Sequence, residues 1–335
     1  MQIDIRKHVS RVLGLVALLA LALPSALAGG RNPGSLIVFP EFDSSAGHNT
    51  LVTITNRRLA SNQGAVRLAF KYVSGETATR CTIADRFEDL SPGDTLSVLV
   101  SAHNPGPFHR GFLYVYAVKL VGGENVPVGF DFLAADVVQL DGTLSLLQSA
   151  TPFVFEARTG LNQPTDLDGD GLRDLDGNEY EPAPDRILIP RFLGQGTYAQ
   201  SDLVLVGLTG GKEFTTLVDF IVFNDNEEVF SAQYAFHCWA RAPLSSVNGV
   251  FGNTFLHDYT NDDANEIVGI PPQEAGWMQI NGNTAWSMLQ SFHDPAVLAL
   301  VVERGGTSGQ PSAEPPFCDG TQNNGDLLPS SVMGD

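Results

Sequence analysis

The chain has 335 residues, of which 43% are hydrophobic, and it carries 38 acidic against 19 basic residues, a formal net charge of −19 at pH 7. Phosphate binding requires clustered Lys and Arg, so this balance argues against a nucleic-acid partner and against anionic membrane surfaces. It favours cations as partners. The length suggests two domains, and the supply of Val, Leu, Ile and Phe is sufficient for real cores.

The first 28 residues have the pattern of a secretory signal peptide. Basic residues precede the apolar run 12–23, and Ala26-Leu27-Ala28 provides small residues for cleavage. The apolar run is too short to cross a bilayer, which takes roughly 20 residues. We therefore expect cleavage after Ala28, no membrane insertion, and a secreted, extracellular or periplasmic mature protein. Loss of the three basic residues and one acidic residue of this segment takes the net charge from −19 to −21.

The segments that follow alternate apolar and polar residues with the period of β-strands. The runs 66–72, 96–100 and 113–118 each place apolar side chains on one face. Turn signals rich in Gly and Pro separate these runs, and long helical patterns with caps are absent from the sequence. The sequence therefore predicts an all-β fold built from immunoglobulin-like or fibronectin-like sandwiches.

The second half of the chain repeats the order of apolar segments in the first half. The matching pairs are LIVFPEF (36–42) with ILIPRF (187–192), NTLVTIT (49–55) with SDLVLVG (201–207), VRLAFKYV (66–73) with LVDFIVFN (217–224), and GFLYVYAV (111–118) with GWMQINGN (276–283). Each copy opens on an apolar-Pro-x-Phe ending. We interpret this order as an internal duplication that gives two tandem sandwiches.

The domain boundaries are expected where these patterns break. The predicted domains are a first sandwich at 32–157, an acidic linker at 158–184 and a second sandwich at 185–304. The segment 305–335 is rich in Gly, Pro, Ser and Asn and is expected to be a poorly ordered tail.

The linker contains TDLDGDGLRDLDGNEYE (165–181), in which seven of the seventeen residues are acidic. Asp166, Asp168 and Asp170 occupy positions 1, 3 and 5 of a loop, with Gly171 at position 6. Calcium takes about 6–8 hard oxygen ligands, and alternate side chains on a curled loop can point at one centre. The sequence therefore predicts a Ca²⁺ site, whose further candidate ligands are the Leu172 carbonyl, Asp174, Asp176, Asn178 and Glu179.

This stretch resembles the calcium loops of EF-hand-like proteins. It resembles still more closely the thrombospondin type 3 repeats of secreted proteins, which favour D-x-D-G-D-G-x-x-D where this chain has D-L-D-G-D-G-L-R-D. An EF-hand loop has Glu at position 12, where this chain has Gly177, and no flanking helices are evident. In thrombospondin-type repeats successive acidic runs share ions, so the resemblance implies one or two Ca²⁺ ions in residues 166–181. The alternative is a flexible acidic spacer held open by its like charges.

The three cysteines exclude a disulfide scaffold but allow one bridge outside the cytoplasm. Cys81 and Cys238 follow comparable segments of the two copies, so we expect them to be buried residues with matching structural roles. A bridge between Cys238 and Cys318 would then attach the tail to the second sandwich.

Motifs of common enzyme classes are absent from the sequence, including H-E-x-x-H, G-x-S-x-G, the P-loop and the dinucleotide fingerprint. We therefore expect a protein without enzymatic activity, secreted, calcium-binding and structural or adhesive, at the cell surface or in the extracellular matrix. Calcium would stiffen the linker, and without it the two domains would tumble independently. Its expected partners are a cell-surface or matrix protein or a polysaccharide.

Two alternatives remain open at this point. A carbohydrate-active enzyme or sugar-binding protein would use the long loop 252–275 of the second copy, with Trp277 and Trp286 beside it. A periplasmic binding or assembly module would use an exposed strand edge. Exposed tryptophans next to carboxylates favour the first alternative, and buried tryptophans favour the structural role.

Overall fold

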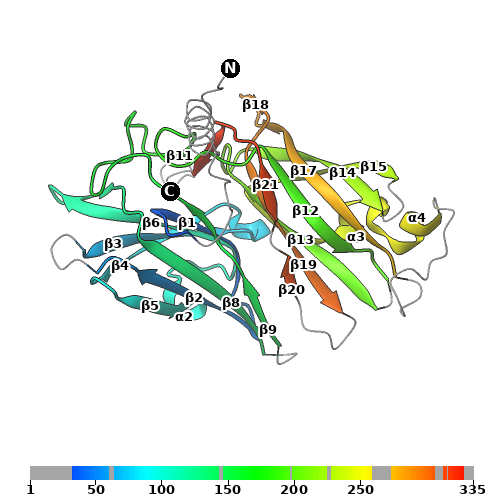
Figure 1. Ribbon diagram of the computed structural model, residues 1–335, viewed down its shortest axis with the longest axis horizontal. Coiled ribbons are helices and arrows are strands. Elements are labelled where there is room, and N and C mark those ends of the chain that lie inside the picture. The colour runs from blue at the N-terminus through cyan, green and yellow to red at the C-terminus, as the bar shows by residue number, and fades with distance from the viewer. Residues whose placement is uncertain are drawn as a thin grey trace, which may run out of the picture. The chain divides into compact units, whose positions relative to one another are not determined.

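The computed structural model describes residues 32–59, 64–142, 146–196, 198–224, 228–258, 273–305, 312–314 and 316–327. The predicted signal peptide and residues 259–272 of the long loop 252–275 therefore lie outside the described residues. Arg31–Asp335 forms one compact unit. The structure is nearly all β, as the sequence predicts, with antiparallel sheets that form sandwiches (Figure 1).

The first sandwich consists of two antiparallel sheets. One sheet has the order β10-β1-β6-β3-β4, with β7 paired to β6, and the other has the order β5-β2-β8-β9. The strands are β1 (Leu36–Asp43), β2 (His48–Asn56), β3 (Val66–Ser74), β4 (Ile83–Leu90), β5 (Thr95–Leu99), β6 (Arg110–Val121), β7 (Glu124–Pro127), β8 (Leu133–Asp141), β9 (Leu146–Ala150) and β10 (Phe153–Phe155). The three runs predicted from period two coincide with β3, β5 and β6.

The second sandwich repeats this arrangement strand for strand. Its sheets have the orders β21-β12-β17-β14-β15, with β18 paired to β17, and β16-β13-β19-β20. The strands are β12 (Arg186–Leu193), β13 (Ala199–Gly207), β14 (Thr215–Asn224), β15 (Val229–Phe236), β16 (Trp239–Pro243), β17 (Ala275–Trp286), β18 (Ser291–His293), β19 (Val297–Gly305), β20 (Ser312–Glu314) and β21 (Phe317–Asp319). Strands β1 to β10 thus correspond in order to β12 to β21.

Local details of the two copies agree as well. The register of β1 shifts between Phe39 and Phe42 against β6, and that of β12 shifts between Ile189 and Phe192 against β17. Each irregularity contains the proline that the sequence repeat matched, because a β-bulge tolerates a residue without an N–H. The four matched sequence pairs fall on β1/β12, β2/β13, β3/β14 and β6/β17, which supports the inferred duplication.

A glycine stands opposite each bulge, because a neighbouring backbone approaches too closely there for a side chain. A Cβ on Gly111 would lie 1.9 Å from the Val73 carbonyl oxygen, and a Cβ on Gly276 would lie 2.4 Å from that of Phe223. Both positions therefore require glycine, so that neighbouring backbones can approach closely.

Helices are short in the described residues. They are α2 (Val100–His103), α3 (Leu244–Val247) and α4 (Asn253–Asp258), with 3₁₀ turns η2 (Thr77–Thr79) and η3 (Gly249–Phe251). None of the described helices has the length and apolar character needed to cross a membrane.

Apolar side chains gather in three clusters. Two of them fill mainly the interiors of the first and the second sandwich. The third contains residues of both sandwiches and of the acidic linker, among them Tyr114, Leu298 and Tyr180. Burial of this shared surface contributes to stability in proportion to its apolar area. The halves are therefore packed against each other, and the expectation that they tumble independently without calcium is wrong.

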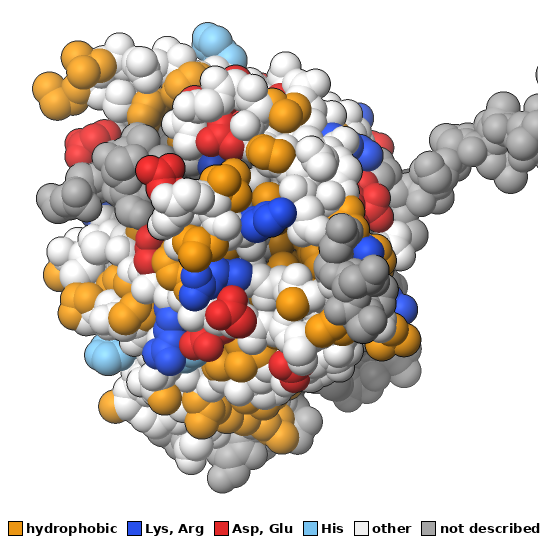
Figure 2. Space-filling model, turned by 90° about the vertical axis from the view of Figure 1, so that its left-hand side faces the viewer, with side chains coloured by type: hydrophobic (Ala, Val, Ile, Leu, Met, Phe, Trp, Pro, Cys, Tyr) orange, Lys and Arg blue, Asp and Glu red, His pale blue; other side chains and the backbone are white. Residues whose placement is uncertain are grey.

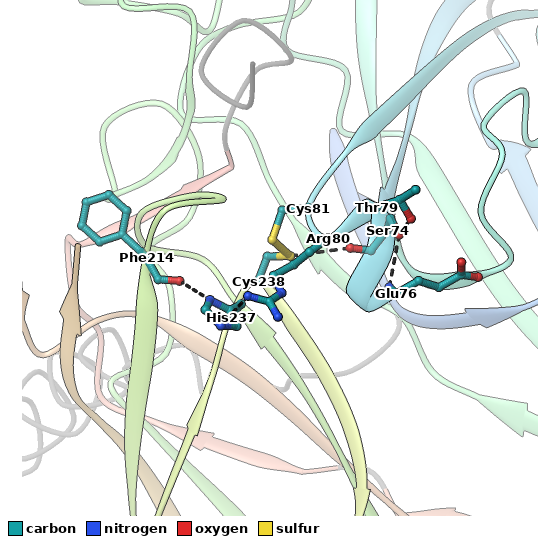
Figure 3. Close-up of a disulfide and its surroundings, with 8 residues drawn as sticks. All are labelled: Ser74, Glu76, Thr79, Arg80, Cys81, Phe214, His237 and Cys238. Atoms are coloured by element: carbon teal, nitrogen blue, oxygen red, sulfur yellow. Dashed lines mark hydrogen bonds between the residues drawn. A yellow bond between two sulfur atoms is a disulfide. The ribbon is translucent and has the colours of Figure 1, made fainter. Parts of the chain in front are cut away.

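The disulfide joins the two halves directly (Figure 3). Cys81, in the turn between β3 and β4, is bonded to Cys238, in the turn between β15 and β16, across 157 positions of sequence. Cys318 is free. The expected Cys238–Cys318 bridge is therefore wrong. The expected equivalence of Cys81 and Cys238 is also wrong, because one precedes β4 and the other follows β15, which is the copy of β4.

A hydrogen-bonded chain flanks this disulfide. Arg80 Nη1 lies 2.8 Å from His237 Nε2, and His237 Nδ1 lies 2.9 Å from the Phe214 carbonyl oxygen (Figure 3). A guanidinium can only donate, so His237 accepts through Nε2 and donates through Nδ1. These contacts connect the β3–β4 turn of the first sandwich to two loops of the second.

A buried ion network also crosses between the sandwiches. Arg241 Nη1 lies 2.6 Å from Glu41 on β1, and Arg241 Nη2 lies 3.1 Å from Asp202 on β13. Glu41 and Asp202 are each 2% exposed. On the surface drawn in Figure 2, basic side chains likewise lie beside acidic ones.

The described parts of the C-terminal segment, residues 312–314 and 316–327, form strands, so the expectation of a poorly ordered tail is wrong for these residues. β20 pairs with β19, β21 pairs with β12, and β22 (Gly325–Leu327) pairs with β11 (Arg173–Leu175) of the acidic linker. A three-residue strand can form with few apolar residues when it adds to the edge of another strand, because that edge supplies its hydrogen-bond partners.

Candidate metal site

The acidic linker is held against the first sandwich by its few apolar and basic residues. Leu175 and Tyr180 are fully buried in the shared apolar cluster, and the Tyr180 hydroxyl lies 2.9 Å from Thr165 Oγ1. Arg173 is 4% exposed, and its guanidinium lies 5.3 Å from the centre of the Tyr116 ring. Arg173 turns into the protein, whereas Asp168 and Asp170 are exposed. The linker is therefore a packed segment, which argues against the flexible-spacer alternative.

The aspartates fold the segment into successive tight turns. A carboxylate oxygen of each accepts a backbone N–H two or three residues ahead, which is the Asx-turn geometry. The acceptor and donor pairs are Asp166 Oδ1 with Gly169 N at 2.8 Å, Asp168 Oδ1 with Asp170 N at 3.1 Å, and Asp170 Oδ1 with Leu172 N at 2.7 Å. The second oxygen of Asp166 lies 3.6 Å from Arg173 Nη2 in an ion pair, whereas the second oxygens of Asp168 and Asp170 make no hydrogen bond among the described residues.

The turns bring the carboxylates together in two groups. Asp166, Asp168 and Glu179 form one group and Asp168, Asp170 and Asp174 the other, and within each group one oxygen per residue lies within 4.8 Å of the others. Asp168 belongs to both groups. The arrangement can therefore hold a metal ion in either group, with Asp168 placed to bridge two ions.

Glu179 closes the loop from its far end. Its side chain is 3% exposed. Its carboxylate accepts the Leu167 N–H and, at 3.4 Å, the Asp174 N–H. Sequence spacing identified Glu179 as a candidate because it follows the motif. What the spacing did not show is that this carboxylate connects the two ends of the loop.

The electrostatics of the site favour a cation. Burial and the neighbouring carboxylates, Asp170 first, raise the pKa of Asp174 to about 7. Burial also raises the pKa of Glu179. The carboxylates repel one another here, because burial limits the screening of their charges by water. A positive ion would stabilise their ionised forms.

The remaining predicted ligands have other contacts. Asp176 accepts from the Asn178 backbone N–H at 2.8 Å and from Asn178 Nδ2 at 2.6 Å. These two residues therefore pair with each other, and Asp176 is in neither carboxylate group. The Leu172 N–H faces Asp170, and its carbonyl remains a predicted ligand.

One acidic residue near the site was not expected from the sequence. Asp326 on β22 lies directly opposite Asp174 on β11, and its carboxylate lies outside the two groups. Burial, followed by the charges of Asp174 and Asp170, raises the pKa of Asp326 to about 8. No sequence pattern marked Asp326, because it lies far from the motif in the segment expected to be poorly ordered.

The two tryptophans beside the long loop differ in their exposure. Trp277 is half-buried and stacks on Phe223 with ring centres 3.9 Å apart, and Trp286 is 40% exposed at the end of β17. The part of the loop between residues 259 and 272 lies outside the described residues.

The turn at Gly171 gives a direct test of the loop geometry. Its φ of +84° is left-handed, and a Cβ there would meet no atom within 4 Å. Gly171→Ala should therefore cost only the backbone penalty, about 1–2 kcal/mol of unfolding free energy. Gly160→Ala is the matched control, because its Cβ would make an ordinary 3.6 Å contact with Gln163. Urea denaturation of both variants measures the difference, and equal losses would show that the turn is not required.

Comparison with known proteins does not show a family for this chain. No protein-family model and no curated protein matches it. Among solved structures, a chain from the cryo-EM atomic structure of Broad Bean Stain Virus is 10% identical, with 90% of this chain and 96% of that chain covered and a TM-score of 0.18. A similarity of this size carries no argument about function, so the function must be argued from the acidic site itself.

Proposed function

We propose that residues 165–181 bind Ca²⁺ and that the protein is a secreted structural or adhesive protein. The observation that carries the metal site is the pair of carboxylate groups sharing Asp168. Both groups offer only hard oxygen atoms, which suit Ca²⁺ or Mg²⁺ and not Zn²⁺. Calcium accepts irregular geometry and a high ligand number, whereas Mg²⁺ demands a near-ideal octahedron. The irregular turns of this segment therefore favour Ca²⁺.

Calcium would act by fixing the linker on the first sandwich. The two halves already share a disulfide and an apolar cluster, so the ion is not needed to join them. It is needed to neutralise the carboxylates that the turns bring together. The expected effect is a rigid segment covering one face of the fold.

A structural or adhesive role agrees with the cavities between the halves. A cavity of about 20 Å³ lies beside Cys238, and a polar one of about 330 Å³ lies between Thr77–Thr82 and Lys212. The larger cavity contains a single carboxylate, Glu213. Glycoside hydrolysis requires two carboxylates, so neither cavity supports the carbohydrate-active alternative. The proposed partner is a cell-surface or matrix protein or a polysaccharide.

Calcium should stabilise the protein, and more so as the pH rises. With a Kd of about 10⁻⁴ M, about 10 mM Ca²⁺ adds about 2.7 kcal/mol per site to the unfolding free energy. In EDTA, Asp174 has a pKa of about 7, raised above its unfolded value of 3.8. Its stabilising contribution is therefore present below the unfolded pKa and lost as the pH rises through 7. For this partly exposed group, we expect a loss of about 1–2 kcal/mol.

Thermal unfolding with Ca²⁺, Mg²⁺ or EDTA between pH 5 and pH 8 measures both effects. Asp94→Asn, a change at an exposed aspartate of the first sandwich, is the control for a general charge effect. A midpoint that does not respond to Ca²⁺ at pH 8 would refute the proposed metal site.

A further inference from the structure

The last described strand brings a carboxylate from the other end of the chain to the acidic segment. β22 pairs antiparallel with β11, and Asp326 is the direct partner of Asp174. Side chains of directly opposed residues in an antiparallel pair project from the same face, and like charges in that position destabilise the pair. The described part of this ribbon has three residue pairs. An unfavourable pair at its centre therefore requires a compensating interaction.

Asp326 is held in place with one oxygen unsatisfied. Its backbone N–H donates to the Leu208 carbonyl at 2.6 Å, which fixes the residue against the second sandwich. Its Oδ1 is buried and has no hydrogen-bond partner among the described residues. A buried carboxylate oxygen without a donor costs free energy, more than a neutral group does. A bound cation would remove that cost and the repulsion from Asp174 together.

We propose that Asp326 is a further ligand of the cation held by Asp168, Asp170 and Asp174, so that calcium fastens the C-terminal strand onto the acidic segment. The inference rests on the proposed calcium site and adds to it a ligand from another part of the chain. Ligands from two distant segments make the ion a crosslink. Part of the binding free energy then stabilises the pairing of β22 with β11.

The proposal predicts that one substitution has opposite effects with and without calcium. Asp326→Asn keeps the shape of the side chain and removes its charge. In EDTA above pH 8, where both carboxylates are ionised, the variant should unfold at a higher temperature than the wild type, because the repulsion from Asp174 is gone. In saturating Ca²⁺ the variant should unfold at a lower temperature than the wild type, because the affinity of one site falls at least about tenfold. A loss of folding would lower the midpoint in both conditions, so the reversal separates the two explanations.

Calorimetric Ca²⁺ titration and thermal unfolding of the full chain test this, with Asp319→Asn as the matched control. Asp319 lies on the neighbouring strand β21, is exposed and contacts Arg186. The proposal requires weaker Ca²⁺ binding and a raised midpoint in EDTA for Asp326→Asn, with no change for Asp319→Asn. If the wild type binds Ca²⁺ and Asp326→Asn binds it equally well, only the role of Asp326 is overturned. If the wild type binds no Ca²⁺, both the metal site and this ligand are overturned.

Discussion

Replacing Cys81 and Cys238 together by serine is expected to lower the unfolding free energy by about 3–5 kcal/mol. The disulfide closes a loop across 157 positions, and without it the unfolded chain regains the entropy that this crosslink removes. Both cysteines are buried at the contact between the halves. The crosslink therefore stabilises the joint between the two sandwiches as well as the whole fold.

Urea denaturation of the double variant, and of the wild type with and without reductant, measures this loss. Cys318→Ser is the control, because Cys318 is free and exposed. Its effect should be within about 0.5 kcal/mol. If the double variant were as stable as Cys318→Ser, the two halves would not depend on the crosslink.

Replacing Arg241 by methionine is expected to cost about 3–5 kcal/mol, the second large effect. The substitution keeps an unbranched side chain but leaves Glu41 and Asp202 buried, at 2% exposure each, without this counter-charge. Gln139 still donates to Glu41 at 2.8 Å, and Arg304 still contacts Asp202. Because these contacts remain, the loss of unfolding free energy can be as small as about 3 kcal/mol.

Two further variants determine whether charge burial causes the loss. Arg186 makes ion pairs with Asp185 and Asp319 on the surface, so Arg186→Met should cost at most about 1 kcal/mol. Adding Glu41→Gln to Arg241→Met removes an uncompensated charge and should restore part of the stability. A double variant that is less stable than Arg241→Met alone would contradict this explanation.

The sequence predicted the strands and the duplication because both depend on the local order of apolar, polar and proline residues. Alternation along β3 and β6 reflects which face is buried, and the proline at each bulge marks the same irregularity in both copies. The duplication also predicts strands beyond residue 304, where the second domain was expected to end. β20 and β21 are the copies of β9 and β10, so two strands were to be expected beyond that residue.

The disulfide was not predictable because it depends on how the two halves pack. Counting residues from a preceding strand placed Cys81 and Cys238 in equivalent positions, although they lie in different turns. The acidic site likewise has one part that local sequence predicts and one part that depends on tertiary packing. The spacing of Asp166, Asp168, Asp170 and Asp174 predicted the grouped carboxylates, because the turns that group them are local. Asp326 comes to lie opposite Asp174 only through the pairing of β22 with β11, which the sequence motif does not encode.

Calorimetric titration of the full chain with Ca²⁺ tests the central claim most directly, with an Asp168→Ala, Asp170→Ala variant as the control. Asp168 belongs to both carboxylate groups, so the double substitution removes ligands from each. The account predicts saturable binding of one or two ions to the wild type and none to the variant. Heat no different from dilution in the wild type, or equal binding by the variant, would contradict it.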